Sequence, residues 1–487
     1  MAIQGIRGGQ LKILTEGQLH QIHLATLEVL EEVGVKVDHR QALEIMADSG
    51  CRVDFDRRVV KIPEYVLKKS LETAPSRITL FGKTPEYDVV LDDTDTVYTM
   101  GGAGALWVLD LEGNRRPATL QDLVNLTRIQ NTLENLHIAH WLVCPQDIPQ
   151  KGADRIIFAT MLKNTQRHQH IIPGGPGGVK DHLEMAAVLQ GSVKEARERP
   201  IFVENVCVTS PLFLPNPNTQ ELIEVAQEGI PMLIEADAVA GATSPFTIGG
   251  CLVEKNATIL SAIALAQMIN PGVPCIYSSS SGIMDMSTGY YSAAAPESTL
   301  IHLAATQLAH YYHLPFQGGN TCDSKIPDAQ MGYERASHFV ALALGGCNII
   351  HVATGNLEQM RLASYEQCVI DDEILGASFR IARGIEINRD TLAVDVLKEV
   401  GPGGNFLAHP HTLRYLRKNR WIPKLSSREN WETWQMKGGK DMREKAKERV
   451  RKILSEPYPE YVSEKAAREI DKIAQKAQER VLNRNKK

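Results

Sequence analysis

Apolar residues in the first part of the chain recur every three to four positions, the spacing of amphipathic helices. Thr15 precedes the stretch 16–34, whose apolar side chains fall on one helical face before a glycine ends it. The stretches 39–50 and 63–74 show the same pattern. We therefore expect a helical cap over residues 1–95.

After residue 95 the pattern changes, and short β-rich runs that end in Gly, Ser or Pro alternate with longer helical stretches. Eight strands, each followed by a helix, are typical of the α/β class and its (β/α)₈ TIM barrel. A doubly wound open sheet is the alternative, but no Gly-x-Gly-x-x-Gly follows the first run. We expect a barrel over residues 96–436, with the helical cap at its amino-terminal end. The runs comprise residues 97–102, 138–145, 168–175, 201–210, 232–239, 274–281, 315–320 and 348–355.

The final segment, residues 437–487, has a different composition. Its 16 basic and 9 acidic residues give it a net charge of +7, whereas the whole chain carries −5. Its few apolar residues are spaced as one helical stripe. We expect a charged helical tail packed on the barrel by that stripe, and docking of a partner is the alternative.

Composition narrows the class of protein. The net charge of −5 gives no indication of nucleic-acid binding, and no run approaches 18 uncharged apolar residues, so no membrane span is expected. The amino terminus lacks the apolar stretch of a signal peptide, which favours a cytoplasmic protein. The eight cysteines are scattered and include no Cys-x-x-Cys, so neither a disulfide framework nor a structural zinc site is expected.

Polar residues inside the β-rich runs are candidates for chemistry, because burying them without a partner is costly. Glu235 and Asp237 share one face of the fifth run by strand alternation. His351 lies near the end of the eighth run, although a lone strand histidine is more often a core residue. His168 and His170 share a face, but no third ligand is evident, so no metal site is expected.

The segment 318–334, GGNTCDSKIPDAQMGYE, gathers amide, hydroxyl, thiol, carboxylate and ammonium groups directly after the seventh run. It is either a solvated loop or a strand end that presents polar groups to a ligand. Active sites of barrels lie at the carboxyl ends of the strands, which favours the second interpretation.

Aromatic residues form a second group in or beyond the predicted strands. A set of rings near one rim can hold a cation by its π faces, the usual arrangement for quaternary ammonium groups. Packing in the core is the alternative. The rings are Tyr98, Phe213, Tyr277, Tyr290, Tyr291, Phe316 and Tyr333.

Several long segments resemble the trimethylamine methyltransferase family, and the similarity covers nearly the whole chain. The resemblance implies a barrel that moves a methyl group from an amine to the cobalt of a partner corrinoid protein, which carries the cobalamin. The segments are residues 241–289, 295–334, 364–376, 400–417 and 431–434.

One departure from the family pattern bears on the substrate. The trimethylamine enzymes carry pyrrolysine in this part of the barrel, and this sequence has none. The chain therefore resembles the non-pyrrolysine branch, whose members demethylate quaternary amines. Glycine betaine is the first expectation, and proline betaine, carnitine and γ-butyrobetaine are alternatives. A betaine-binding barrel without turnover is a second class of function, and a homo-oligomer is possible in either.

An unrelated barrel lyase or aldolase is a third option, but no predicted strand ends in the lysine that a Schiff base would need. For methyl transfer, we expect a substrate pocket at the rim with His351 and Asp323 as its catalytic groups. Asn320 completes the polar wall and Gln330 supports it, unless Asp323 instead caps a helix that begins near residue 327. The remaining expected substrate-binding residues are Tyr98, Phe213, Glu235, Asp237, Tyr277 and Phe316.

Overall fold

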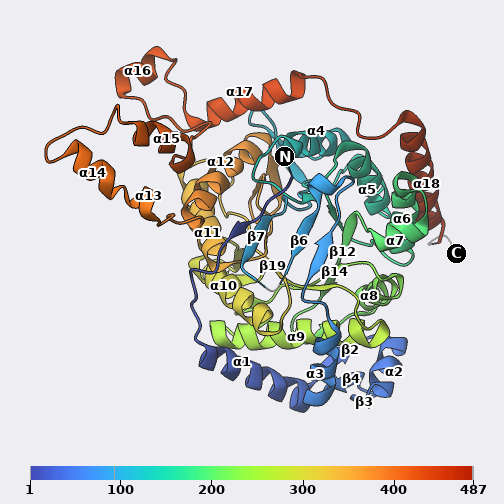
Figure 1. The fold of residues 1–487 in the computed structure, drawn as a ribbon. Helices are drawn as coiled ribbons and strands as arrows, with labels where there is room; N and C mark the ends of the chain where they lie inside the picture. The colour runs from blue at the N-terminus through green and yellow to red at the C-terminus, as the bar shows by residue number, and fades with distance from the viewer. Residues whose placement is uncertain (1, 93, 485–487) are drawn as a thin grey trace.

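A computed structural model describes residues 2–92 and 94–484 and shows an α/β fold built on a curled nine-stranded sheet (Figure 1). Strand β1 pairs antiparallel with β7, and every other neighbouring pair in this sheet is parallel. The strands in spatial order are β1 (Ile6–Arg7), β7 (Thr96–Thr99), β20 (Ile349–Ile350), β19 (Phe316–Gly318), β16 (Cys275–Ser279), β14 (Met232–Ala236), β12 (Phe202–Val208), β11 (Gln169–Ile171) and β10 (Ala139–His140).

The two ends of the parallel part of the sheet approach each other. A single parallel bridge pairs Met100 with Ile138. The Gly101 N–H donates to the Ile138 carbonyl at 3.1 Å, and the Ile138 N–H donates to the Thr99 carbonyl at 3.0 Å. These bonds join the end of β7 to the residue before β10, so that backbone groups at both ends are paired.

Helices follow each of the eight parallel strands and cover the outside of the sheet. Each predicted β-rich run overlaps one of these strands, but most runs extend beyond it because they include the polar residues of the strand ends. The helices in chain order are α4 (Leu120–Asn131), α5 (Ala153–Asn164), α6 (Gly178–Gln190) with α7 (Val193–Glu198), α8 (Asn216–Glu228), α9 (Ile248–Ile269), α10 (Pro296–Tyr311), α11 (Ala329–Gly345) and α12 (Tyr365–Ala382).

The amino-terminal end of the sheet is closed by a β-hairpin, β5 (Ile78–Leu80) with β6 (Val89–Leu91), which lies across it in Figure 1. The alternate residues of the hairpin and of the strands form one apolar layer, since successive side chains of a strand point to opposite faces. This layer contains Ile78, Leu80, Val89, Leu91, Tyr98, Met100, Ile138, Val203, Leu233, Ile276 and Ile349.

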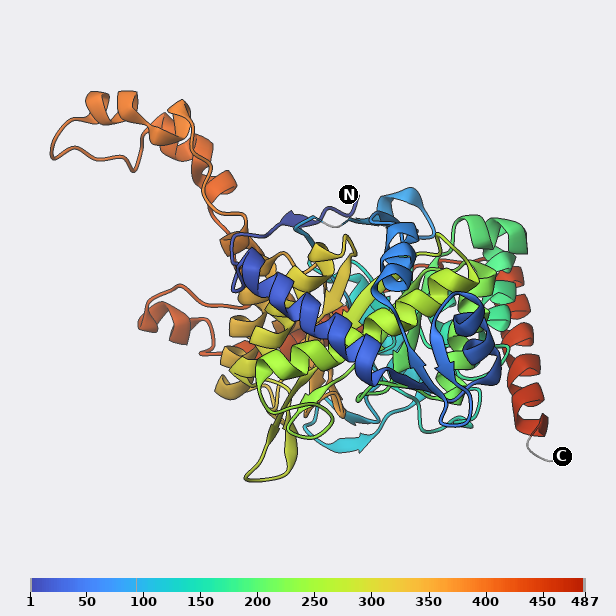
Figure 2. The same ribbon diagram turned by 90° about the horizontal axis from the view of Figure 1, so that it is seen from below.

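The expectation that helices cover this end was therefore wrong. Helices α1 (Glu16–Glu28) and α3 (Glu64–Thr73) pack against α9 on the side of the fold, and α1 runs beside α9 in Figure 2. Their apolar stripes match the apolar surface of α9. Helix α1 begins with a capping box at Thr15 and is continued by a short π-helix (Val29–Val33). Helix α2 of the cap spans Arg40–Asp48.

Smaller sheets complete the described part of the fold. The cap contains β2 (Val35–Val37), β3 (Arg52–Asp54) and β4 (Val59–Lys61), joined by β13 (Phe213–Leu214). Two further sheets lie in the connections that follow the parallel strands of the large sheet. The first consists of β8 (Trp107–Leu109), β9 (Arg115–Pro117), β21 (Asn356–Leu357) and β22 (Leu362–Ser364). The second consists of β15 (Val239–Ala240), β17 (Gly282–Asp285) and β18 (Tyr290–Ser292). A 3₁₀ turn spans Pro85–Tyr87.

The carboxyl-terminal part divides into a projecting portion and a packed portion (Figures 1 and 2). Helices α13 (Arg389–Leu392), α14 (Val394–Val400), α15 (Pro410–Asn419) and α16 (Trp431–Met436) extend away from the body. By contrast, α17 (Met442–Ser455) packs against α12 and α4, and α18 (Glu464–Arg484) packs against α5 and α6.

Helix α9 is the most apolar long helix among the described residues. By length and composition it could cross a membrane, but 78% of its most apolar 18-residue window is buried inside the protein. It lies between the curled sheet and the helices of the cap, so its apolar surface is covered on both sides.

The apolar layer under the hairpin generates a stability prediction. Leu80 is fully buried in it, so Leu80→Ala should lower the free energy of unfolding by about 2–5 kcal/mol. Urea denaturation measures this change. Leu24→Ala is the matched control, because Leu24 is 50% exposed and its truncation should change the free energy by no more than about 0.5 kcal/mol. A loss at Leu80 as small as that at Leu24 would show that the hairpin is not part of the cooperative core.

Candidate active site

Beyond the apolar layer, toward the carboxyl ends of the strands, the side chains on the same inward faces become polar. This change follows from alternation, since eight of these residues lie two or four positions after a member of the apolar layer. The other two, His170 and Gln317, share the inward face because they pair with His140 and Ser278 on the neighbouring strands. The polar group consists of His140, His170, Asn205, Cys207, Glu235, Asp237, Ser278, Ser280, Gln317 and His351.

Two carboxyl groups stand at the centre of this group. Glu235 accepts a hydrogen bond from the Asn205 amide at 2.6 Å and one from the Ser280 hydroxyl at 3.1 Å. Asp237 accepts the Ser280 N–H at 2.6 Å. Alternation in the sequence placed Glu235 and Asp237 on one face, and the structure adds that Ser280, directly after strand β16, connects them.

The two carboxyl groups resist ionisation. Burial raises the pKa of Glu235, although hydrogen bonds from Asn205 and Ser280 act in the opposite direction. Burial, and then the neighbouring charge of Glu235, raise the pKa of Asp237 to about 8. Asp237 keeps a solvent-exposed surface even though protein surrounds it closely. We infer that it lines a recess that solvent can enter.

Three histidine rings lie beside the carboxyl groups. The ring centroids of His140 and His170 are 4.1 Å apart, and those of His140 and His351 are 5.5 Å apart. Burial lowers the pKa of His140 and of His351 to about 3 and that of His170 well below its usual value. All three rings are therefore neutral near pH 7, and each can donate one hydrogen bond and accept another.

The hydrogen bonds of His351 indicate its tautomer. Its Nδ1 lies 3.4 Å from the Ser280 hydroxyl, whose single proton is directed to Glu235. Nδ1 is therefore the donor, and Nε2, which has no partner among the described residues, is left as an acceptor. No group of three or more His, Cys, Asp or Glu side chains in the described part of the chain is arranged to hold a metal ion.

The loop that follows β19 reaches the same end of the sheet. Gly319 has φ +148°, and a Cβ there would lie 2.7 Å from the His351 carbonyl oxygen, so glycine permits this close approach. The Asn320 amide donates to the Ser280 carbonyl at 3.2 Å and to the Tyr291 hydroxyl, which leaves its side-chain oxygen without a partner. Asn320 thus faces the polar group as an acceptor.

Asp323 holds neighbouring loops together. Its carboxylate accepts the N–H groups of Ala293 and Ala294, each at 3.1 Å, and the Gln359 amide at 2.8 Å. It makes no hydrogen bond to His351. The alternative that Asp323 caps the following helix is wrong, because Asp328 accepts the Met331 N–H at 3.0 Å and caps α11.

Gln330 lies at the surface and acts on the loop indirectly. Its amide donates to Glu334 at 2.8 Å, and Glu334 in turn accepts the Asp323 N–H at 2.8 Å. Gln330 is therefore connected to Asp323 through Glu334 and does not contact the polar group.

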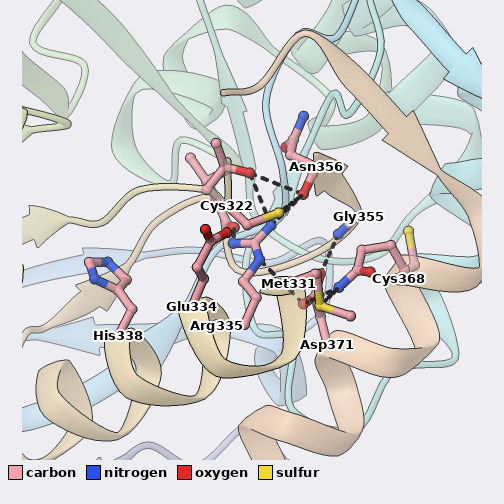
Figure 3. Close-up of polar contacts among 12 residues, drawn as sticks. Cys322, Met331, Glu334, Arg335, His338, Gly355, Asn356, Cys368 and Asp371 are labelled. Carbon is pink, nitrogen blue, oxygen red and sulfur yellow. Dashed lines mark hydrogen bonds and ion pairs between the residues drawn. The ribbon is translucent and has the colours of Figure 1, made fainter. Parts of the chain in front are cut away.

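The buried guanidinium of Arg335 on α11 fixes both strand-end loops (Figure 3). It donates to the carbonyls of Val352 at 2.7 Å and Asn320 at 3.3 Å, and to the Asn356 carbonyl at 2.7 Å. Its Nε lies 3.5 Å from the Asp371 carboxylate. One side chain thus holds the loops after β19 and β20, which carry Asn320 and the residue following His351.

The predicted aromatic set is not gathered at one place. Tyr277 and Phe316 lie on the outward faces of their strands, where both rings face the ammonium group of Lys255 on α9, at 5.6 and 5.9 Å. Tyr98 belongs to the apolar layer at the opposite end of the sheet, and Phe213 lies in the cap sheet beneath Lys36.

The rings that do lie beside the polar group are Trp141 and Tyr291. Trp141 stacks on His140 with centroids 5.3 Å apart, and the Tyr291 hydroxyl donates to the Ser280 carbonyl at 2.6 Å. Tyr290 is exposed, and so is Tyr333.

Sequence reasoning missed several residues of the site. Ser280 and Gln317 could have been found from the sequence. Once the register of β14, β16 and β19 is known, the alternation of side chains places both on the inward face. Trp141 directly follows the strand residue His140. Arg335 carried no such signal, because it lies within a helix and its partners are backbone carbonyls.

The contacts of Arg335 predict a large effect of its removal. Arg335→Met should lower the free energy of unfolding by about 3–5 kcal/mol, because it leaves three carbonyls and the Asp371 carboxylate buried without their cation. Thermal or urea denaturation measures the loss. Arg361→Met, at an exposed position of the same region, is the control and should be nearly neutral. Equal stability of the two variants would contradict the role given to Arg335.

Comparisons with known proteins give the family. Residues 3–481 match the family described as trimethylamine methyltransferase (MTTB). The chain is 36% identical over 475 residues to the trimethylamine methyltransferase MttB of Desulfitobacterium hafniense, covering 97% of this chain and 95% of that protein. It is 34% identical over 449 residues to the glycine betaine methyltransferase of the same species, covering 92% and 93% of the two chains.

A solved structure supports the fold. The hydroxylamine complex of MtmB aligns with 92% of this chain and 95% of its own, with a TM-score of 0.51 at 12% sequence identity. The chain belongs to the trimethylamine methyltransferase family and is a methyltransferase.

Proposed function

We propose that this methyltransferase takes a methyl group from a quaternary amine, with glycine betaine as the first candidate, and passes it to the Co(I) of a corrinoid carried by a separate protein. The observation that carries the proposal is the pair of carboxyl groups with raised pKa values, buried Glu235 and Asp237 at the recess, beside three neutral histidines at the carboxyl ends of the strands. The similarity to a glycine betaine methyltransferase and the absence of pyrrolysine from the sequence support the substrate class.

The proposal includes a closed (β/α)₈ barrel as the scaffold, in a cytoplasmic protein. The bridge between Met100 and Ile138 supports closure, because it joins the two outer parallel strands. In such a barrel the polar group lies at the end where active sites are found.

The carboxyl pair suits a fixed positive charge. A trimethylammonium group has no proton to donate, so it is held by charge and by aromatic faces. Glu235 and Asp237 supply the charge once they ionise, and the rings of Trp141 and Tyr291 contact residues of the polar group. The cation favours the ionised carboxylates, which lowers the raised pKa values on binding.

A betaine also carries a carboxylate, which needs hydrogen-bond donors. The Gln317 amide nitrogen and both ring nitrogens of His170 are buried without partners among the described residues. We place the substrate carboxylate near these groups, with His351 between the carboxylate end and the ammonium end of the substrate. Asn320 offers its free oxygen to the ammonium side.

The reaction needs little acid or base chemistry from the protein. The Co(I) centre of the corrinoid supplies the nucleophile when its carrier protein docks. The nitrogen leaves as a neutral tertiary amine because the quaternary nitrogen already carries the positive charge, so no general acid is required. The residues of this chain hold the cation, direct one methyl group outward and limit access of water. The exposed surface of Asp237 fits a co-substrate that approaches from the rim.

Other candidates remain as outcomes of the test. Proline betaine, carnitine and γ-butyrobetaine present the same trimethyl- or dimethylammonium chemistry with different bulk, and a binding barrel would retain the pocket without turnover.

Methylcobalamin formation from Co(I) cobalamin and a panel of quaternary amines tests the function directly. We expect turnover with one betaine and a loss of about 10²-fold or more for Glu235→Gln and His351→Ala in protein that circular dichroism shows to be folded. Glu32→Gln, at an exposed position of the cap, is the control and should keep full activity. Binding of a betaine without methylcobalamin formation would support the binding barrel, and full activity of both site variants would place the site elsewhere.

The raised pKa of Asp237 predicts how affinity depends on pH. Below about 8 the carboxyl group is protonated, so binding the cation releases a proton and the dissociation constant falls as pH rises, by up to about tenfold per unit. Above that value the dependence levels off. Calorimetry in buffers of different ionisation enthalpy measures the released proton. Asp237→Asn should bind more weakly and lose the dependence, and a pH-independent wild type would refute the assignment.

A further inference from the structure

Residues 385–420, with helices α13, α14 and α15, form an arm that leaves the body of the protein (Figures 1 and 2). No residue of these three helices is buried. A segment that buries nothing gains no stability from the core of its own chain. Its side chains are therefore free to contact another molecule.

The arm exposes large apolar side chains along its whole length. The largest apolar patch of a soluble monomer is about 300–600 Å². One partner contributes about 800 Å² to a stable interface, and nine large apolar side chains exposed along one arm supply a substantial part of such a share. They are Ile385, Ile387, Leu392, Val394, Leu397, Phe406, Leu407, Leu413 and Leu416, each between 41% and 84% exposed.

Charged groups of the arm pair with one another. Arg414 lies 3.4 Å from Asp390, and Lys418 lies 2.7 Å from Glu386. These pairs connect α15 to the segment around α13. Three cations of the arm, Lys398, Arg417 and Arg420, are not in an ion pair in the described structure, and the exposed apolar side chains outnumber them. The expected partner surface is therefore apolar rather than strongly charged.

The same chain carries an apolar groove at the root of the arm. The groove has a volume of about 410 Å³ and lies between α11 and α12, where Val340, Ile374 and Ile381 line it with Trp421. Ile381 is 58% exposed. The arm begins shortly after α12 and ends just before Trp421, so the groove lies at its root. We therefore consider the apolar side chains of the arm and the groove together as one candidate surface.

We propose that this surface is the interface with a second copy of the chain, in which the arm of each copy lies in the α11–α12 groove of the other. This arrangement closes as a two-fold dimer because the exchange is reciprocal, with each arm in the groove of the partner. The amount of apolar surface favours a permanent partner. A corrinoid protein that must dock and leave in every turnover would use a smaller and more polar surface.

The oligomeric state of the full-length protein tests the proposal. In sedimentation experiments at micromolar concentration, the wild type should have at least twice the mass of the chain. The double variant Leu413→Glu/Leu416→Glu should weaken the association by about 30-fold or more, and Ile381→Glu in the groove should do the same. Leu24→Glu is the matched control, because Leu24 is 50% exposed on α1, outside this surface, and it should keep the wild-type mass.

Each outcome bears on the proposal. A monomeric wild type overturns it, as do arm and groove variants that keep the wild-type mass. If the wild type is monomeric and the arm variants instead lose methyl transfer to a corrinoid protein, the arm belongs to that partner. If the arm variant does not fold, judged by circular dichroism, Ile381→Glu decides alone. Activity with free cobalamin is measured separately, so failure of the proposed chemistry cannot be mistaken for failure of the interface.

Discussion

The arrangement of the candidate site depends on the guanidinium of Arg335. Backbone carbonyls at the ends of two neighbouring strands point into the protein, where water does not satisfy them, and a guanidinium is the side chain with enough donors to bind several at once. It contacts Asn320, Val352 and Asn356, so the loops after β19 and β20 keep one relative position. Burying this charge is tolerable because Asp371 lies beside it.

The position of these loops determines the polar group. Asn320 reaches the Ser280 carbonyl only because Gly319 allows the backbone to approach His351. Ser280 then lies between Glu235 and Asp237. The result is a polar region in which Glu235 and Asp237 have raised pKa values, and perturbed pKa values of this kind cluster at functional sites.

The body of the protein buries its apolar helix surfaces, whereas the arm leaves them exposed. In the body, α9 is covered on one side by the sheet and on the other by the cap, so a strongly apolar helix is stable there. In the arm, leucine and isoleucine side chains remain exposed although the helices that carry them are short. Short isolated helices are marginal in water, which is a second physical reason to expect a partner for this segment.

The sequence by itself determined the eight strand and helix repeats, the boundaries of the cap helices and the shared face of Glu235 and Asp237, because these depend on spacing along the chain. It determined the family as well, through long matching segments. The tertiary structure alone decided which face of a strand points inward. Tyr277 and Phe316 alternate with Ser278 and Gln317, and packing against α9 turned the aromatic residues outward. It also decided that a hairpin closes the amino-terminal end of the sheet and that Arg335 binds two loops, since both depend on contacts between residues distant in sequence.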